Sequence, residues 1–349
     1  MTKTLLAVDG NSLIHRSFHA LFSSNLRTSD GRPTWAVKGA LSQILGAVQR
    51  TNADAIVIGF DDAGNNSRKV AHPTYKANRT EKPADLTDQL ALAVDVFRSA
   101  GLHVVIPDGL EADDVLASAA ATATAAGWHT VVCTSDRDSF ALINDTTSVL
   151  RIINGGVEAS PVLTPERLRI LVGIDPQQYR QYAAMRGDTS DNLTGIHGIG
   201  EKTAVKILNA FGSVEAAFAD VDTNGGQRVA AEVGKAVVKK LADPEGRAAF
   251  WRNVDIMTMR TDLYLGIDLD APFGEGLLPV DELELSNALD AVEFYSLKTL
   301  ARQMLTWSGD AATVGAGPQA PPPVPVVDLS VASVAASRAG EPEEDLTLF

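Results

Sequence analysis

TLLAVD, at residues 4–9, is an almost wholly apolar run that ends in an aspartate. AIVIGFD at 55–61 repeats this pattern, and LHVVIP at 102–107 and HTVVCTSD at 129–136 are two more apolar runs of strand length. Such runs are typical of parallel strands that are buried on both faces. Helix-like segments near 36–49, 86–100 and 111–127 alternate with them. We therefore predict an α/β fold with a mostly parallel central sheet flanked by helices.

The chain divides into three regions by pattern. Residues 1–160 carry the α/β pattern, and residues 161–306 read as mostly helical, with glycine-rich turns near 195–200 and 224–226. Residues 307–349 are rich in proline, alanine and valine and show no helical or strand period. We expect a catalytic α/β part, a helical part and a flexible tail.

Composition limits the possible classes of protein. No apolar run approaches the roughly 18–20 residues that a membrane span needs, and the start of the chain does not resemble a signal peptide. Cys133 is the single cysteine, which excludes an internal disulfide and fits a reducing cytoplasm. The net charge of −14 argues against nucleic-acid binding, unless the acids are concentrated in one site.

Acidic side chains follow all four predicted strands. Ligands of open parallel sheets bind beyond the carboxyl ends of the strands, so we expect these seven acids on one face, with a further pair in GDTSDN at 187–192. In chain order the acids are Asp9, Asp61, Glu111, Asp113, Asp114, Asp136, Asp138, Asp188 and Asp191. Each has an ordinary alternative when taken alone: Asp9 could be a helix N-cap, and Glu111 to Asp114 could be first-turn acids.

Crowded carboxylates repel one another and need compensating cations. Oxygen ligands without cysteine or a histidine cluster favour the hard ions Mg²⁺ or Mn²⁺, and two such ions can promote hydrolysis of a phosphate ester. A phosphatase with an aspartate nucleophile is a rival class, but it would need a second acid two residues after Asp9, where this chain has Asn11.

The ordered motifs resemble those of the bacterial and phage 5′-nuclease family, which includes the N-terminal part of DNA polymerase I. They are VDGNSLIHRSFHA at 8–20, GFDDA at 59–63, YKANR at 75–79, EADD, TSDRD and GDTSDN followed by GIHGIGEKTA. The resemblance implies a PIN-like 5′-nuclease fold and a site in which all nine acids hold two or more metal ions. Two positions depart from the family pattern: Asp62 is inserted before Ala63, and Ser67 stands where an aromatic residue is common.

A basic segment interleaved with an aromatic residue lies at 64–84. Basic and aromatic residues together suit single-stranded nucleic acid, although a solvated basic loop has the same composition. By the resemblance this segment begins an arch over the site, where Lys76 and Arg79 steer the scissile phosphate, Arg68 contacts DNA and Tyr75 stacks on a base. Arg16, in the first motif, is expected near the same phosphate.

The glycine-rich segment at 195–203 precedes a predicted helix. A turn that leads into a helix N-terminus offers backbone N–H groups to phosphate. An ordinary turn between two helices, without a phosphate contact, has the same sequence pattern. The resemblance implies a helix–hairpin–helix-type element that grips duplex DNA without reading its sequence, with K⁺ at the turn. The residues assigned to this contact are Gly198, Gly200, Lys202 and Thr203.

The chain ends in EEDLTLF, whose apolar residues are Leu346, Leu348 and Phe349. They resemble a short peptide with which bacterial replication proteins dock on the sliding clamp, although Asp345 stands where that peptide has glutamine. An incidental apolar end is the alternative.

Taken together, the sequence predicts a monomeric 5′→3′ exonuclease and flap endonuclease, active on 5′ flaps, nicks and ends of DNA and on RNA primer ends. A catalytically silent protein that binds DNA junctions is the alternative.

Overall fold

The computed structural model describes residues 2–306. The predicted docking residues Leu346, Leu348 and Phe349 lie outside the described residues. Within 2–306, no helix is both long and apolar enough to cross a membrane.

Six strands form the central sheet in the order β3-β2-β1-β4-β5-β6. The first five in this order pair in parallel, and β6 is antiparallel to β5. The strands are β1 (Thr4–Asp9), β2 (Ala55–Gly59), β3 (His103–Val105), β4 (His129–Thr134), β5 (Thr147–Arg151) and β6 (Val162–Leu163). The predicted α/β fold with a mostly parallel sheet is confirmed. Since β1 lies between β2 and β4, the carboxyl ends of these three strands are neighbours at one edge.

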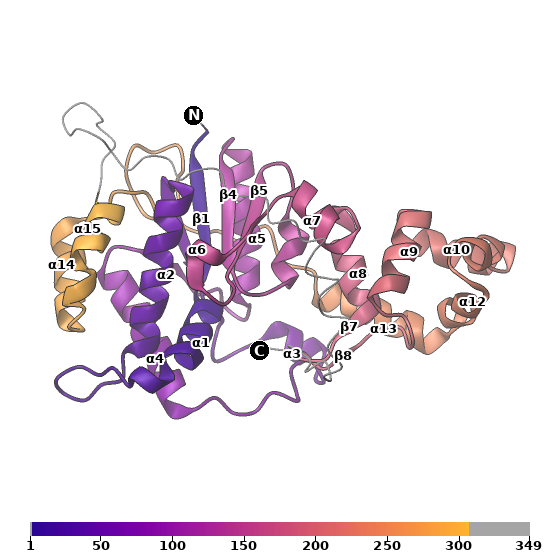
Figure 1. Ribbon diagram of the computed structural model, residues 1–349, viewed down its shortest axis with the longest axis horizontal. Helices are drawn as coiled ribbons and strands as arrows, with labels where there is room; N and C mark the ends of the chain where they lie inside the picture. The colour runs from indigo at the N-terminus through magenta and orange to yellow at the C-terminus, as the bar shows by residue number, and fades with distance from the viewer. Residues whose placement is uncertain (1, 307–349) are drawn as a thin grey trace, which may run out of the picture. The chain divides into compact units, whose positions relative to one another are not determined.

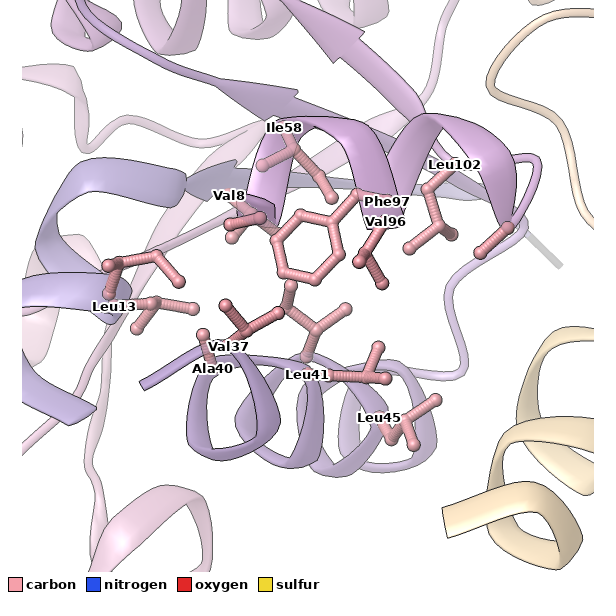
Figure 2. Packing of buried hydrophobic residues seen from close by; sticks show 14 of the residues in the cluster. Val8, Leu13, Val37, Ala40, Leu41, Leu45, Ile58, Val96, Phe97 and Leu102 are labelled. Carbon is pink, nitrogen blue, oxygen red and sulfur yellow. The ribbon is translucent and has the colours of Figure 1, made fainter. Parts of the chain in front are cut away.

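Alternating residues of each strand enter two separate cores. Leu6 and Val8 of β1 belong to a core formed with α1 (Gly10–Leu21), α2 (Trp35–Thr51) and α4 (Ala84–Ser99). Leu5 and Ala7 face the opposite core, which includes α5 (Ala112–Ala125). Figure 2 shows Phe97 of α4 packed between the strand residues and α2. The apolar runs of the sequence are therefore strands covered on both faces, as their composition predicts.

The helical part begins after β6. Its elements are α7 (Pro165–Val172), α8 (Tyr179–Arg186), the paired short strands β7 (Gly187–Asp188) and β8 (Leu193–Thr194), α9 (Glu201–Phe211), α10 (Val214–Asn224), α11 (Gln227–Glu232), α12 (Lys235–Ala242) and α13 (Pro244–Ile256). Figure 1 shows α9, α10 and α12 grouped together, on the far side of α8 from the sheet. Smaller helical turns are α3 (Ser67–Ala71), α6 (Gly156–Ala159), η1 (Phe22–Ser24), η2 (Asp138–Leu142), η3 (Pro176–Gln178) and η4 (Tyr295–Leu297).

The end of the helical part differs from our expectation. Residues 258–281 contain neither helix nor strand, and they return to the edge of β2, where Ile56 N donates to Gly276 O at 2.7 Å. After this return, α14 (Glu282–Ala291) and α15 (Lys298–Leu305) join the core of α2 and α4. The helical part that we expected to extend to residue 306 therefore ends earlier. α14 and α15 belong to the α/β part, where they complete the cover of the sheet.

Candidate metal centre

Asp9 joins the first strand to the first helix. It caps α1 by accepting a hydrogen bond from Ser12 N at 2.8 Å, and its other oxygen accepts one from Thr134 Oγ1 at 2.8 Å. The side chain is only 5% exposed. The N-cap role that was an alternative to a functional role is therefore real, and it anchors the carboxylate at the edge where β1 and β4 end.

Asp61 is held by a reciprocal pair of hydrogen bonds with Asn11. Asn11 Nδ2 donates to Asp61 Oδ2 at 3.0 Å, and Asp61 N donates to Asn11 Oδ1 at 3.0 Å. Ala112 N donates to the second oxygen of Asp61 at 2.9 Å, which links the site to the start of α5. Asn11 therefore positions Asp61. In the sequence, Asn11 stands out only because it replaces the second acid of a phosphatase, and this positioning role was not predicted.

Mutual repulsion shows that the strand-end carboxylates are neighbours. Burial, followed by the charges of Asp61 and Asp136, raises the pKa of Asp9 to about 7. Desolvation by the surrounding protein, and then the charge of Asp136, raises the pKa of Asp113 and of Asp138 well above the ordinary aspartate value. These acids come from the ends of β1, β2 and β4, from the first turn of α5 and from η2. The predicted convergence at the carboxyl edge is thus present in the folded chain.

The helical part contributes Asp188 and Asp191 through the turn between β7 and β8. Both charges help to raise the pKa of Asp138, so the turn lies beside the strand-end acids. Ser190 donates to Asp188 Oδ1 from both its backbone N, at 2.8 Å, and its hydroxyl, at 2.6 Å. The expected pair therefore reaches the site from a part of the chain that is distant in sequence.

Asp114 is placed differently from the other acids. Its side chain is wholly buried, and the two Nη atoms of Arg68 each donate a hydrogen bond to one of its oxygens at 2.7 Å. Arg260 N and Glu111 N also donate to it, at 2.8 and 3.1 Å. A carboxylate with all its acceptor positions filled has little capacity for an ion. Asp114 therefore departs from the expected metal ligand and instead fixes α5 to Arg68.

The basic segment faces the acids. Lys76 Nζ donates to Glu111 Oε1 at 2.6 Å and lies 4.0 Å from Asp191 Oδ2, while Arg79 pairs with Asp191. Because of these partners, the pKa of Glu111 is lowered despite its burial, chiefly by Lys76. Lys76 and Arg79 are therefore beside the site as expected, but in this state they neutralise carboxylates.

Tyr75 corrects one expectation. The ring is only 5% exposed, and its hydroxyl donates to Glu111 Oε2 at 3.1 Å. Lys76 Nζ lies 4.7 Å from the ring centroid. A ring enclosed in this way offers no face to a base, so base stacking is wrong for this conformation. Its apolar contacts with Leu193 and Ile256 show that it fastens the basic segment to the helical part.

The two departures from the family motifs have structural roles. Gly109 N and Gly64 N both donate to the Asp62 carboxylate at 2.8 Å, so the inserted Asp62 ties the turn after β2 to the turn after β3. Ser67 N donates to Gly109 O at 2.8 Å and begins α3. The base of the basic segment is therefore held by backbone hydrogen bonds where an aromatic side chain is absent.

The segment at 195–203 links β8 to α9. A Cβ at Gly195 would collide with the carbonyl of Met185, so only glycine permits this close crossing of α8. Gly198 has φ +74 and its carbonyl accepts a hydrogen bond from Lys240 Nζ at 2.5 Å. Gly200, the N-cap of α9, has open space where a Cβ would stand. Lys202 and Thr203 lie in the first turn of α9.

The carboxylates fit hard divalent cations by their chemistry but are not yet arranged around one. Within residues 2–306, no three His, Cys, Asp or Glu side chains form a set that could hold a metal ion as placed. Lys76, Arg79 and Arg68 form ion pairs with Glu111, Asp191 and Asp114. Desolvation and repulsion raise the pKa values of four other acids, Asp9, Asp113, Asp136 and Asp138. Divalent cations would lower the repulsion among these carboxylate oxygens and would replace the lysine and arginine charges.

Two family models match the chain in sequence. The 5′–3′ exonuclease N-terminal resolvase-like domain matches residues 4–170, and the 5′–3′ exonuclease C-terminal SAM fold matches residues 174–275. The chain belongs to the 5′–3′ exonuclease family. It is 34% identical over 295 residues to DNA polymerase I of Mycobacterium tuberculosis, and 36% identical over 294 residues to the thermostable DNA polymerase I of Thermus aquaticus. Each alignment covers 84% of this chain but only 31% and 32% of the relative, so the chain spans about a third of their length.

Solved structures with the same fold include a phage exonuclease and a DNA-bound catalytic core. A phage T5 5′-exonuclease with bound zinc is 21% identical, with a TM-score of 0.55 over 73% of this chain and 89% of that chain. The catalytic core of Rad2 in complex with DNA substrate is 18% identical, with a TM-score of 0.54 over 87% of this chain and 91% of that chain. At these identities the likeness shows that this 5′–3′ exonuclease family member shares their fold.

Removing one repelling charge should stabilise the metal-free protein. The raised pKa of Asp113 means that ionisation costs more in the folded chain than in the unfolded one, so stability is lost as pH rises above about 4. We expect Asp113→Asn to raise the free energy of unfolding in chelator at pH 8 by roughly 2 kcal/mol, the energy of one like-charge pair at about 8 Å and an effective dielectric constant of about 20. The gain should shrink at pH 5.

Urea denaturation at both pH values measures this effect. Asp95→Asn, on the exposed face of α4, is the matched control and should change stability by less than about 0.5 kcal/mol. Addition of Mg²⁺ should reverse the order, because the wild type then has the better ligands. A variant less stable than the wild type in chelator at pH 8 would mean that Asp113 is not under repulsive strain.

Proposed function

We propose that this protein is a divalent-metal-dependent, structure-specific 5′-nuclease, which hydrolyses phosphodiester bonds at 5′ ends and flaps of nicked or branched DNA. The observation that carries the proposal is the convergence of acids from β1, β2, β4, α5 and the β7–β8 turn. Desolvation and mutual repulsion raise the pKa values of four acids of this group, Asp9, Asp113, Asp136 and Asp138. A structural role does not require such repulsion, whereas divalent cations relieve it.

Eight of the nine acids are proposed to hold two or more Mg²⁺ or Mn²⁺ ions, with Asp114 supporting them through Arg68. The holding set is Asp9, Asp61, Glu111, Asp113, Asp136, Asp138, Asp188 and Asp191. Bound there, the ions supply the positive charge that activates a water and stabilises the leaving oxygen. Asn11 and Thr134 keep Asp61 and Asp9 oriented by hydrogen bonds. The chain thereby contributes prearranged oxygen ligands.

Lys76 and Arg79 are proposed to exchange partners when the site is loaded. In the present state they neutralise Glu111 and Asp191. With ions held by these carboxylates, the lysine and the guanidinium would be free to contact the scissile phosphate, whose charge they can stabilise. Arg16, whose guanidinium donates to Asn154 Oδ1 at 2.8 Å, is proposed to contact the same DNA strand. The basic segment thus acts as a counter-charge first and a phosphate contact second.

The turn before α9 is the proposed grip on duplex DNA. No side chain caps the N-terminus of α9, and Gly200 leaves open space in front of it, which suits the approach of a phosphate to the backbone and to Lys202 and Thr203. K⁺ at this turn would have to compete with Lys240, whose ammonium already binds the Gly198 carbonyl. Contacts of this kind fix the position of a duplex and leave its sequence unread.

Three further proposals concern the setting of the reaction. We extend the nuclease proposal to action on RNA primer ends, to a monomeric state and to a reducing cytoplasm. The single, buried Cys133 fits that compartment. Docking of Leu346, Leu348 and Phe349 on a sliding clamp would raise the local concentration of the enzyme at loaded junctions. Titration of the chain against a clamp, with and without its last six residues, tests this contact separately from nuclease activity.

Loss of one proposed ligand should stop cleavage without stopping binding. We expect Asp136→Asn to lower the single-turnover cleavage rate of a labelled 5′-flap substrate in Mg²⁺ by on the order of a thousandfold, because an amide is a weaker ligand than a carboxylate. Affinity for the flap should remain within about threefold of the wild type. Asp95→Asn is the control and should cleave normally.

The same assay separates the proposed enzyme from a catalytically silent junction-binding protein. A wild-type chain that binds flaps tightly but yields no product in Mg²⁺ or Mn²⁺ would favour the silent protein. Cleavage by Asp136→Asn at the wild-type rate would remove Asp136 from the site. The length of the labelled product reports whether exonuclease or flap endonuclease activity predominates.

Lys76 offers a test of the partner exchange. We expect Lys76→Gln to slow single-turnover cleavage on the order of a hundredfold while weakening flap binding much less, because the group acts on the reacting phosphate. In chelator the same variant should lower the melting temperature, since Glu111 loses its counter-charge. Lys69→Gln, an exposed lysine in the same basic segment, is the matched control. Equal effects of the two variants on rate and affinity would make the segment a generic basic loop.

A further inference from the structure

Three arginines from separate segments meet on the β5 side of the acidic site. Arg151 ends β5 and is paired in register with Thr134, which hydrogen-bonds to Asp9. Arg137 lies between Asp136 and η2, and Arg16 on α1 reaches Asn154 in the loop after β5. Arg137 and Arg16 are near enough for their charges to act on Arg151. The chain therefore concentrates positive charge beside its acids.

These guanidiniums lack acidic partners. Within residues 2–306, Arg68, Arg79, Arg186 and Arg247 each form an ion pair with a carboxylate, but Arg16, Arg137 and Arg151 do not. The Nε of Arg151 is buried and has no hydrogen-bond partner, and its guanidinium lies 5.7 Å from the centroid of the Phe140 ring. A chain with net charge −14 has acids in excess, so three unpaired arginines in one place need an explanation.

We propose that Arg16, Arg137 and Arg151 form an anion subsite that binds one phosphate of the DNA, next to the phosphate that is cleaved. The inference rests on the proposed nuclease function and extends it to the path of the DNA. Guanidiniums bind phosphate oxygens in forked pairs, which makes them better suited to this contact than lysines. Phe140 holds Arg151 in place, and the hydrogen bond to Asn154 holds Arg16.

The position of the subsite relates it to the reaction. Arg137 is adjacent in sequence to Asp136, and the charge of Asp136 also acts on Arg151. The bound phosphate therefore lies beside the acids without displacing an ion from them. On the other side, Arg137 is close to Tyr179 and Tyr182 of α8, the helix that leads to the turn before α9. Arg137 thus lies near both the acids and the helix that leads to the proposed grip on the duplex.

Binding measured without cleavage tests the subsite. Flap substrates that each carry one neutral methylphosphonate near the junction are titrated in chelator against the wild type, Arg151→Gln and Arg137→Gln. We expect each variant to bind the natural substrate about tenfold more weakly, and the slope of log affinity against log salt to fall by about 0.9. One methylphosphonate position should weaken the wild type by a similar factor and have no further effect on Arg151→Gln.

Controls make each outcome decisive. Arg302→Gln removes an exposed arginine on α15 that pairs with Glu282, and it should bind like the wild type. Arg137 is exposed, so its variant remains informative even if Arg151→Gln unfolds, which a thermal melt reports. Substrates with a 5′-phosphate or a 5′-hydroxyl show whether the bound phosphate is terminal or internal, and coupling to either supports the subsite.

The inference and the nuclease proposal can fail separately. The subsite is overturned if the affinity losses of Arg151→Gln and Arg137→Gln add in full to the loss caused by each methylphosphonate. It is also overturned if these variants bind DNA no more weakly than Arg302→Gln. Both outcomes hold whether or not the wild type cleaves DNA. If the wild type cleaves nothing but the coupling is found, the subsite stands as a DNA contact and the nuclease proposal fails.

Discussion

Repulsion among carboxylates at the carboxyl end of the sheet is the constraint on which the rest of this structure depends. Five parallel strands bring their ends to one edge. β1 ends in Asp9, and Asp61 and Asp136 lie two residues beyond the ends of β2 and β4. Burial and neighbouring charges raise the pKa of Asp9 to about 7, which is an electrostatic cost that apolar packing has to offset. The two cores on either side of the sheet supply that packing, because most strand residues are buried.

The same repulsion explains the arrangement of the cations. Arg68 binds Asp114 and Glu111 and also donates to the carbonyls of Ile256 and Thr258 at the end of α13. Lys76 reaches Glu111, and its backbone N donates to Asp191 O at 2.9 Å. Arg68 and Lys76 thus each bind an acid of the α/β part and a backbone carbonyl of the helical part. The ion pairs that balance the charge therefore also set the position of the β7–β8 turn, which brings Asp188 and Asp191 to the site.

The sequence predicted the features that depend on local pattern. Apolar runs such as 4–9 and 55–61 indicated buried parallel strands. Because ligands bind at the carboxyl ends of such strands, the acids after them were expected to lie close together. What it could not predict depends on tertiary packing. Tyr75 reads as an exposed aromatic among cations, yet contacts with Leu193 and Ile256 bury it. Asp114 reads like Asp113, but a helix turns adjacent side chains in different directions, and only Asp114 meets Arg68.

Charge balance also accounts for the apparent conflict between an acidic chain and the DNA substrate that we propose for it. The net charge of −14 counts acids that face each other across the site and are neutralised there by Arg68, Lys76 and Arg79. With divalent ions held by these carboxylates, the lysine and arginine charges would be free and the repulsion among the strand-end acids would be relieved. The surface that we propose meets a phosphate backbone would then carry these cations together with Arg16, Arg137 and Arg151. Net charge therefore does not predict nucleic-acid binding here, because the sign of the potential at the site depends on what occupies its carboxylates.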